Sequence, residues 1–174
     1  MGETLITYYS RMQSPVAPLL LAATERGLRC LQFREKIPGE GEREGWIESR
    51  EKLRRYEEEL AAYFRQELRE FTVPLDLRGT AFQKRCWEAL RRIPYGQTCS
   101  YADIAKEVGS PRAFRAVGQA NHQNPVAIFV PCHRVIGANG TLTGYGGGLG
   151  VKEKLLALEG ASVQQPFRFT AAAV

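Results

Sequence analysis

A cysteine and a histidine stand side by side in the segment Pro131-Cys132-His133-Arg134-Val135. A thiol is strongly nucleophilic only when deprotonated, so a reactive cysteine needs a neighbour that lowers its pKa. His133, one of only two histidines in the chain, could do so directly or through a water molecule. The alternative is a buried structural cysteine at the end of a strand, since free cysteines are among the most buried residues. The pair alone favours this alternative, and the surrounding sequence reverses the balance.

The residues before Cys132 predict its surroundings. Residues 126–130 are all apolar and should bring the cysteine to the end of a buried segment, in a concave pocket poor in water. Adjacent residues of an extended chain point to opposite sides, so a bridging water is expected to carry the proton between Cys132 and His133.

A proton relay of this kind also needs a carboxylate that orients the imidazole, and Glu159 is the candidate. It follows a predicted helix over residues 151–158 and precedes Gly160. An anion is disfavoured at the C-terminal end of a helix, and a residue that breaks this rule points to function. A solvent-exposed helix end is the alternative interpretation.

The glycine-rich stretch 144–148 lies between the cysteine and that helix. No Gly-Lys-Ser or Gly-Lys-Thr follows it, which excludes a P-loop. We therefore predict a flexible lid over the pocket.

Composition predicts a soluble globular protein of one domain or two small ones, because 44% of its 174 residues are hydrophobic. No segment is long enough to span a membrane, and the N-terminus has no signal-peptide pattern. Cys30, Cys86, Cys99 and Cys132 lack C-x-x-C spacing, which argues against a zinc cage or a secreted disulfide framework. We expect reduced thiols, a cytoplasmic location and no membrane partner; a structural disulfide of Cys30 or Cys86 stays open.

Charge is unevenly distributed along the chain. Residues 1–77 hold 12 Lys and Arg against 14 Asp and Glu, a net charge of −2, whereas residues 78–174 hold 12 against 5, a net charge of +7. A basic C-terminal half is typical of a domain that faces nucleic acid, although many basic faces are merely solvated.

The N-terminal half predicts a small sheet and one helix. Residues 19–23 and 28–33 have the pattern of two strands, and a glycine-containing turn between them indicates a hairpin. Residues 35–45 have the composition of a loop. Helical spacing within 48–68 predicts an amphipathic helix on this sheet, with four core side chains: Leu53, Tyr56, Leu60 and Phe64. A short strand is predicted over residues 71–77. Gly79 interrupts this pattern, and we place the domain boundary there.

The C-terminal half predicts helices with recognisable starts. Thr80 should cap a first helix whose apolar face holds Phe82, Cys86, Ala89, Leu90 and Ile93. After a turn at 94–97, Ser100 and Asp103 form a capping box for a short helix that ends at Gly109. Ser110 should cap a second helix with Pro111 at its first position, which runs to about Asn121.

Two helices joined by a tight turn suggest a helix-turn-helix. The expected fold is α+β: a small N-terminal β-sheet with a helix, followed by a mainly α-helical, winged-helix-like domain. The expected domains are 1–77, 78–162 and a C-terminal tail, 163–174.

The second helix could contact DNA. One face holds four polar residues that could meet phosphates: Arg112, Arg115, Gln119 and His122. Small residues would let its backbone approach a groove closely: Ala113, Ala116, Gly118 and Ala120. An ordinary surface helix is the alternative.

With these motifs in order, the chain from Gly79 to Gly160 resembles the O6-alkylguanine-DNA alkyltransferases, or methylated-DNA–protein-cysteine methyltransferases. The N-terminal half resembles the family in general layout. The matching motifs are Gly79-Thr80-Ala81-Phe82-Gln83, Ile93-Pro94-Tyr95-Gly96, Ser100-Tyr101, Arg115-Ala116-Val117-Gly118, Asn124-Pro125, Pro131-Cys132-His133-Arg134-Val135 and Gly144-Tyr145-Gly146-Gly147-Gly148-Leu149.

The resemblance implies direct reversal of DNA damage. Cys132 would accept the alkyl group, activated by His133 through water and by Glu159, and Asn124 would hold the supporting turn. The lesion, O6-alkylguanine and also O4-alkylthymine, would be flipped out of double-stranded DNA through the minor groove. Arg115 would fill the gap and Tyr101 would donate toward guanine N3 and lie on the phosphate side.

The remaining site residues also follow from the resemblance. The DNA-binding face would include Arg112, Ala116, Gly118 and Gln119. The carbonyls of Cys132 and Val135 would accept from the guanine amine, and Pro131, Tyr145 and Gly146 would border the alkyl pocket. Gly146 suggests room for groups larger than methyl. No cofactor is implied, and the protein is expected to act as a monomer.

Alkyl transfer to sulfur has a consequence for turnover. Attack of the Cys132 thiolate on a saturated carbon gives a thioether, which is not hydrolysed as a thioester is. Each molecule should therefore act once, and the added methyl group could destabilise a packed site by about 1–3 kcal/mol.

The sequence departs from the family at Phe114, where a small residue is common; the ring could alter packing on DNA or turn into the core. Some members bind zinc in the N-terminal domain, but both histidines here, His122 and His133, lie in the C-terminal half, so we predict no metal.

Two other functions compete with repair. An alkyltransferase-like protein binds the lesion without repairing it and lacks the cysteine, so Cys132 argues against it. A cysteine hydrolase would use Cys132, His133 and Glu159 as a triad, but no hydrolase motif is recognisable and Arg115 lies on a helix-turn-helix.

Overall fold

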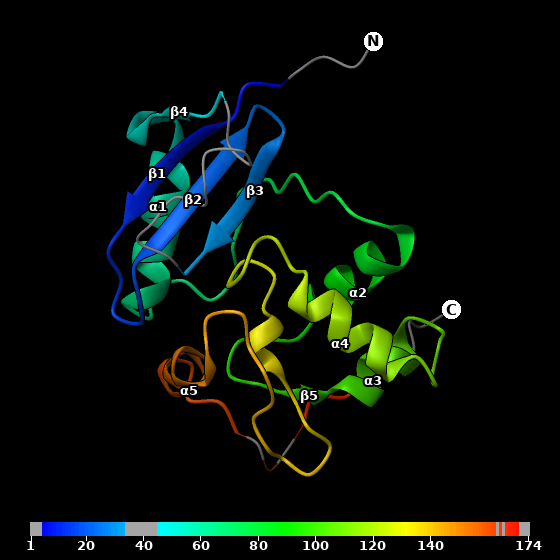
Figure 1. The fold of residues 1–174 in the computed structure, drawn as a ribbon. Coiled ribbons are helices and arrows are strands. Elements are labelled where there is room, and N and C mark those ends of the chain that lie inside the picture. Colours follow the sequence, from blue (N-terminus) through cyan, green and yellow to red (C-terminus); the bar gives the residue numbers. More distant parts are fainter. Residues whose placement is uncertain (1–4, 34–44, 163, 165, 171–174) are drawn as a thin grey trace. The chain divides into compact units, whose positions relative to one another are not determined.

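The computed structural model describes residues 5–33, 45–162, 164 and 166–170, and the chain divides into two compact units, Met1–Arg78 and Gly79–Val174 (Figure 1). The predicted loop over 35–45, apart from Gly45, lies outside the described residues, as does part of the predicted tail, 163–174. No helix within the described ranges is long and apolar enough to cross a membrane.

The N-terminal unit is built on a four-stranded sheet in the order β3-β2-β1-β4. Its strands are β1 (Tyr8–Met12), β2 (Leu19–Thr24), β3 (Gly27–Gln32) and β4 (Ile47–Glu48). The antiparallel pairing of β2 with β3 confirms the predicted hairpin, and every residue of β2 is buried. Strand β1 pairs antiparallel with β2 and parallel with the two-residue β4; neither β1 nor β4 was predicted.

One helix, α1 (Arg50–Phe64), packs against the sheet through contacts with β1 and β2. Ser49 caps it by accepting from the backbone N–H of Lys52. Three of the four predicted core positions are buried, but Phe64 is half-buried and Tyr63 is fully buried in its place. Tyr63 continues the i, i+3 series from Leu60, which explains the shift of one residue.

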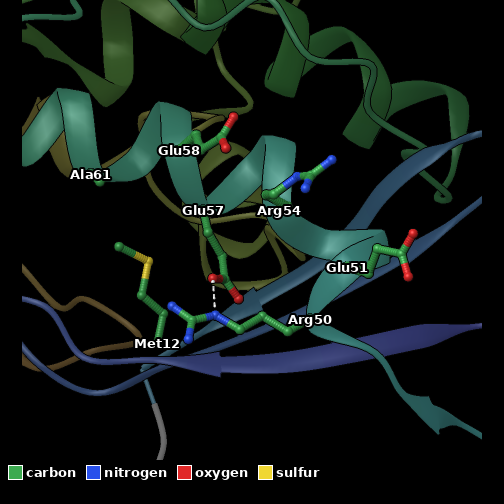
Figure 2. Close-up of a pocket in the computed structure, with 7 residues that line it drawn as sticks. All are labelled: Met12, Arg50, Glu51, Arg54, Glu57, Glu58 and Ala61. Carbon is green, nitrogen blue, oxygen red and sulfur yellow. Dashed lines mark hydrogen bonds and ion pairs between the residues drawn. The ribbon is translucent and has the colours of Figure 1, made fainter.

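A buried carboxylate ties α1 to the sheet. Glu57 accepts a hydrogen bond from the Ser10 hydroxyl of β1 at 2.6 Å and one from Arg50 Nε at 3.0 Å. Figure 2 shows the Glu57–Arg50 contact beside a cavity of about 490 Å³, which is lined by Met12, Arg50, Glu51, Arg54, Glu57, Glu58 and Ala61. Because the buried carboxylate already has partners in the protein, we assign this cavity no ligand.

The strand predicted over 71–77 is wrong. The segment forms one isolated bridge between Leu75 and Leu28, with hydrogen bonds from Leu28 N to Pro74 O and from Asp76 N to Leu28 O. Pro74 has no N–H to extend a ladder, so pairing stops after a single bridge.

The C-terminal unit is mainly helical. Its elements are α2 (Ala81–Arg91), β5 (Cys99–Ser100), α3 (Tyr101–Glu107), α4 (Phe114–His122), the 3₁₀ helix η1 (Cys132–Arg134), β6 (Val135–Ile136) and α5 (Leu149–Leu158). Both predicted caps are confirmed: Thr80 with Gln83, and Ser100 with Asp103, form capping boxes. Of the predicted apolar face of α2, Phe82 is only half-buried and the other four residues are buried.

Helices α2, α3 and α4 pack on one another, and Trp87 Nε1 donates to the carbonyl of Ala120 at 2.9 Å across the α2–α4 contact. The predicted start of the second helix is wrong: α4 begins at Phe114, not after Ser110. The Ser110 carbonyl instead accepts from Ala113 N at 2.8 Å, which closes a turn, and proline at the second position favours such a turn. Arg112 therefore lies in the turn before α4.

Candidate functional site

Cys132 begins the 3₁₀ helix η1 and directly follows the buried segment 126–131. The prediction of a buried approach is confirmed, but the extended geometry predicted for Cys132 and His133 is wrong. The carbonyl of Pro131 accepts from Arg134 N at 3.0 Å, so the chain turns tightly at the cysteine. The approach is itself unusual, because the buried, β-branched Ile128 has a φ of 72°. A residue of this type adopts such backbone at a cost, which packing must offset.

Asn124 stabilises this turn and contacts the sulfur. Its Nδ2 donates to the carbonyl of Val130 at 2.8 Å and to Cys132 Sγ at 3.1 Å, and its Oδ1 accepts from Val126 N at 3.0 Å. Burial raises the pKa of the Cys132 thiol, and the hydrogen bond from Asn124 and the charge of Lys152 oppose that rise. The donor and the cation offset only part of the effect of burial, so the pKa stays raised and the thiol is neutral until a base takes its proton.

His133, Arg134 and Glu159 form a buried network. Glu159 Oε1 lies 2.7 Å from His133 Nε2 and 2.9 Å from Arg134 Nη2, and Oε2 lies 2.9 Å from Arg134 Nε. Arg134 Nη1 also donates to the carbonyl of Ile93 at 2.7 Å. Of the two interpretations of Glu159, the exposed helix end is therefore wrong: the side chain is buried.

The ionisation states follow from these contacts. Burial alone would raise the pKa of Glu159, but the hydrogen bonds and charges of His133 and Arg134 lower it well below its usual range. Burial lowers the pKa of His133, and the positive charges of Arg134 and Lys152 lower it further. The hydrogen bond and charge of Glu159 act in the opposite direction and raise it. We conclude that Glu159 is an anion beside a neutral imidazole, with Arg134 as its charged partner.

An ionised carboxylate only accepts hydrogen bonds, so His133 Nε2 must carry the imidazole proton. Nδ1 is then an acceptor, and it is buried without a hydrogen-bond partner among the described residues. The imidazole is therefore ready to take a proton at Nδ1.

Two glycine-dependent features bring Glu159 into place. Gly96 has a φ of 78°, and its N–H donates to Glu159 Oε2 at 3.3 Å; a Cβ at this position would lie 3.0 Å from the carbonyl oxygen of Glu159. Gly160, with a φ of 61°, ends α5 directly after Glu159.

Lys152 is a site residue that the sequence analysis missed. Its side chain is fully buried, and Nζ donates to the carbonyls of Val135 at 2.6 Å and Thr143 at 3.1 Å. Burial lowers its pKa to about 8. Helical periodicity was the sequence signal that could have identified Lys152. This lysine precedes Leu155 by three residues, Leu156 by four and Glu159 by seven, so all four lie on one buried face of the helix.

The parallel pairing of β5 with β6 brings Tyr101 near the cysteine turn. Cys99 pairs with Val135 and Ser100 with Ile136, so Tyr101 follows a strand that lies beside the residues after Arg134. The Tyr101 hydroxyl lies 2.9 Å from Thr143 Oγ1. Thr143 was also missed, and its sequence neighbours gave no signal for it.

Two of the other predicted pocket residues, Pro131 and Val135, flank the cysteine turn as the residues before and after η1. Pro131 and Val135 are buried, and Tyr145 is half-buried. Gly146 is exposed, with open space where a Cβ would be. Gly148 N donates to the carbonyl of Tyr145 at 2.9 Å, so the glycine-rich stretch forms a turn directly before α5. Its role as a lid stays a prediction.

Helix α4 presents most of the predicted DNA-binding residues. Arg115, Ala116 and Gln119 are exposed and Gly118 is half-buried, whereas Val117 and Ala120 face the core. Arg112 is exposed in the preceding turn. The Phe114 side chain is 49% exposed, so of the two expectations for this ring, packing into the core is wrong.

All four cysteines are buried, and no two of them form a disulfide with each other. Within the described part of the chain, no three histidine, cysteine or acidic side chains come together in a way that could hold a metal ion.

Comparisons with known proteins cover both units. Residues 7–77 match the ribonuclease-like domain of 6-O-methylguanine DNA methyltransferase, and residues 81–161 match its DNA-binding domain. A methylated-DNA–protein-cysteine methyltransferase from Methanosarcina acetivorans is 51% identical over 88% of this chain and 99% of its own. A second methyltransferase of this name, from Mycobacterium leprae, is 53% identical over 85% of this chain and 89% of its own.

Solved structures agree with these sequence matches. The crystal structure of Mycobacterium tuberculosis O6-methylguanine methyltransferase superposes with a TM-score of 0.83 at 50% identity, over 89% of this chain and 93% of that one. A structure of M. tuberculosis OGT in complex with DNA gives a TM-score of 0.80 at 49% identity, over 88% of this chain and 92% of that one. The α+β fold predicted from the sequence is confirmed by these likenesses.

Proposed function

The chain belongs to the 6-O-methylguanine DNA methyltransferase family, and on that premise we propose that it repairs O6-alkylguanine in double-stranded DNA by transferring the alkyl group to Cys132. O4-alkylthymine is the second expected substrate. The observation that carries the assignment to Cys132 is its place beside a buried His133–Glu159–Arg134 network, in contact with Asn124.

The reaction follows from the protonation states. His133 Nδ1 takes the proton of the Cys132 thiol through a water, and Glu159 stabilises the imidazolium that forms. The thiolate attacks the alkyl carbon, so an S–C bond forms as the C–O6 bond breaks and the electron pair stays on guanine. Tyr101 donates to guanine N3 as negative charge grows on the leaving base. The thioether product has no leaving group for water to displace, so each molecule acts once.

Access to the lesion is assigned to α4. Its small residues, the exposed Ala116 and the half-buried Gly118, would let the helix lie close to the minor groove. Gln119 and Arg112 would contact the DNA backbone. Arg115 would enter the stack and occupy the space left by the flipped nucleotide. The carbonyl of Val135, with Pro131, Tyr145 and Gly146, would border the base. The M. tuberculosis relative solved with DNA supports DNA as the partner. We expect a cytoplasmic monomer that needs no cofactor.

Intact-protein mass spectrometry tests this function. Wild type and Cys132→Ser are incubated with excess duplex DNA that carries O6-methylguanine. The expected result is one added methyl group on wild type, mapped to Cys132, and none on the variant. An unmodified wild-type mass with retained lesion binding would instead assign the chain to the non-repairing lesion-binding proteins. Repeated turnover would indicate a hydrolase.

A further inference from the structure

We propose that Thr143 is a positioning residue for alkyl transfer: Lys152 holds its backbone carbonyl, and its hydroxyl orients the Tyr101 hydroxyl toward the leaving base. The inference rests on the proposed function, because it concerns how Tyr101 serves that reaction. It begins from a single contact, the 2.9 Å separation of Tyr101 Oη and Thr143 Oγ1.

The two hydroxyls are held by structure on both sides. Tyr101 is the first residue of α3, directly after Ser100, whose capping box fixes the start of that helix. Thr143 belongs to the segment between β6 and α5, and its carbonyl accepts from Lys152 Nζ at 3.1 Å. The contact between the hydroxyls therefore joins two segments that are 42 residues apart in sequence.

Lys152 connects this contact to the base pocket. The same Nζ donates to the carbonyl of Val135 at 2.6 Å, and Val135 pairs with Cys99 in the β5–β6 ladder. Tyr101 follows Cys99 by two residues, so this pairing places Val135 close to Tyr101 along the chain. The links from Tyr101 through Thr143, Lys152, Val135 and Cys99 therefore return to Tyr101, with the chain from Cys99 to Tyr101 as the last link. A buried amine that satisfies two carbonyls restrains both segments.

The direction of the hydrogen bond gives Thr143 its role. A tyrosine hydroxyl has one proton, so it can donate to guanine N3 only if it accepts from Thr143. In that arrangement Thr143 donates to Tyr101 and Tyr101 donates to the base. Hydrogen bonds in such a chain strengthen one another, so the donation from Tyr101 grows stronger as charge develops on guanine.

The test is a double-mutant cycle on the single-turnover rate of methyl transfer, measured with saturating O6-methylguanine duplex. The variants are Thr143→Val, Thr143→Ser, Tyr101→Phe and the double variant Tyr101→Phe with Thr143→Val. Thr143→Val removes the hydroxyl while keeping the shape, and it should slow transfer about five- to tenfold, the factor one neutral hydrogen bond supplies. Thr143→Ser keeps the hydroxyl and should restore the wild-type rate.

The cycle separates orientation from general packing. If Thr143 acts through Tyr101, the double variant should be no slower than Tyr101→Phe alone. The matched control is Thr141→Val, because the Thr141 hydroxyl bonds to Asn139 Oδ1 instead. The rate of Thr141→Val should equal that of wild type. Thr143→Val should leave DNA affinity unchanged, and any fall in its melting temperature should match that of Tyr101→Phe, which loses the same hydrogen bond.

Three outcomes would overturn the inference: a wild-type rate for Thr143→Val, a Thr143→Ser rate as low as that of Thr143→Val, or additive losses in the double variant. Failure of the proposed function looks different, because wild type itself would then leave Cys132 unmethylated.

Discussion

The Glu159 carboxylate accepts a 2.7 Å hydrogen bond from His133 Nε2, and both side chains are completely buried. This contact fixes the imidazole tautomer and leaves Nδ1 as the acceptor. Arg134 holds the other side of the same carboxylate, so the charge of Glu159 is compensated even while His133 is neutral.

Glu159→Gln should slow methyl transfer about a hundredfold, the lower end of what a general base contributes, because His133 acts as that base with the support of Glu159. The amide lacks the charge that stabilises the imidazolium, although it has nearly the same shape. The measurement is the single-turnover rate, with DNA affinity determined separately by fluorescence anisotropy. An unchanged rate would exclude Glu159 from the proton relay.

Arg134→Met should lower the free energy of unfolding by about 3–5 kcal/mol, because it leaves a buried carboxylate without its charged partner. Urea unfolding measures the loss. Arg115→Ala is the control, since an exposed side chain away from such networks changes stability by only about 0.5 kcal/mol or less. Similar losses in both variants would show that the buried ion pair is not the cause.

Stability should fall as the solution is acidified. The folded-state pKa of His133 lies below its ordinary 6.5 and that of Glu159 below its ordinary 4.5, so the unfolded chain binds more protons in both cases. The stabilisation is complete above pH 6.5; it declines first as unfolded His133 is protonated and further as the pH falls below 4.5. Urea midpoints across this range measure the decline, and Glu159→Gln should lose the second part of it. A flat profile would contradict these ionisation states.

Arg115→Ala should reduce repair of duplex lesions much more than reaction with free O6-benzylguanine. Free base needs no flipping, so a residue that fills the gap in the DNA stack contributes nothing to that reaction. Both rates are measured by mass spectrometry of Cys132 alkylation. Equal losses on the two substrates would remove the gap-filling role from Arg115.

Sequence patterns predict structure correctly where a few neighbouring residues decide it. The hairpin formed by β2 and β3 and the capping boxes at Thr80 and Ser100 depend on contacts within a few residues. One error arose where two local signals compete. Ser110 followed by Pro111 suits a helix start and also a turn, and the turn is the one present.

By itself, the sequence determined the order of the motifs and the family they indicate, and it predicted Cys132 with His133 as the reactive pair. These features are local or depend on residue identity. Tertiary structure decided how Glu159 reaches His133 from 26 residues away, that Arg134 shares its carboxylate, and that Lys152 and Thr143 belong to the site. Contacts between residues so far apart arise only when helices and strands pack, because burial then forces each polar group to find a partner.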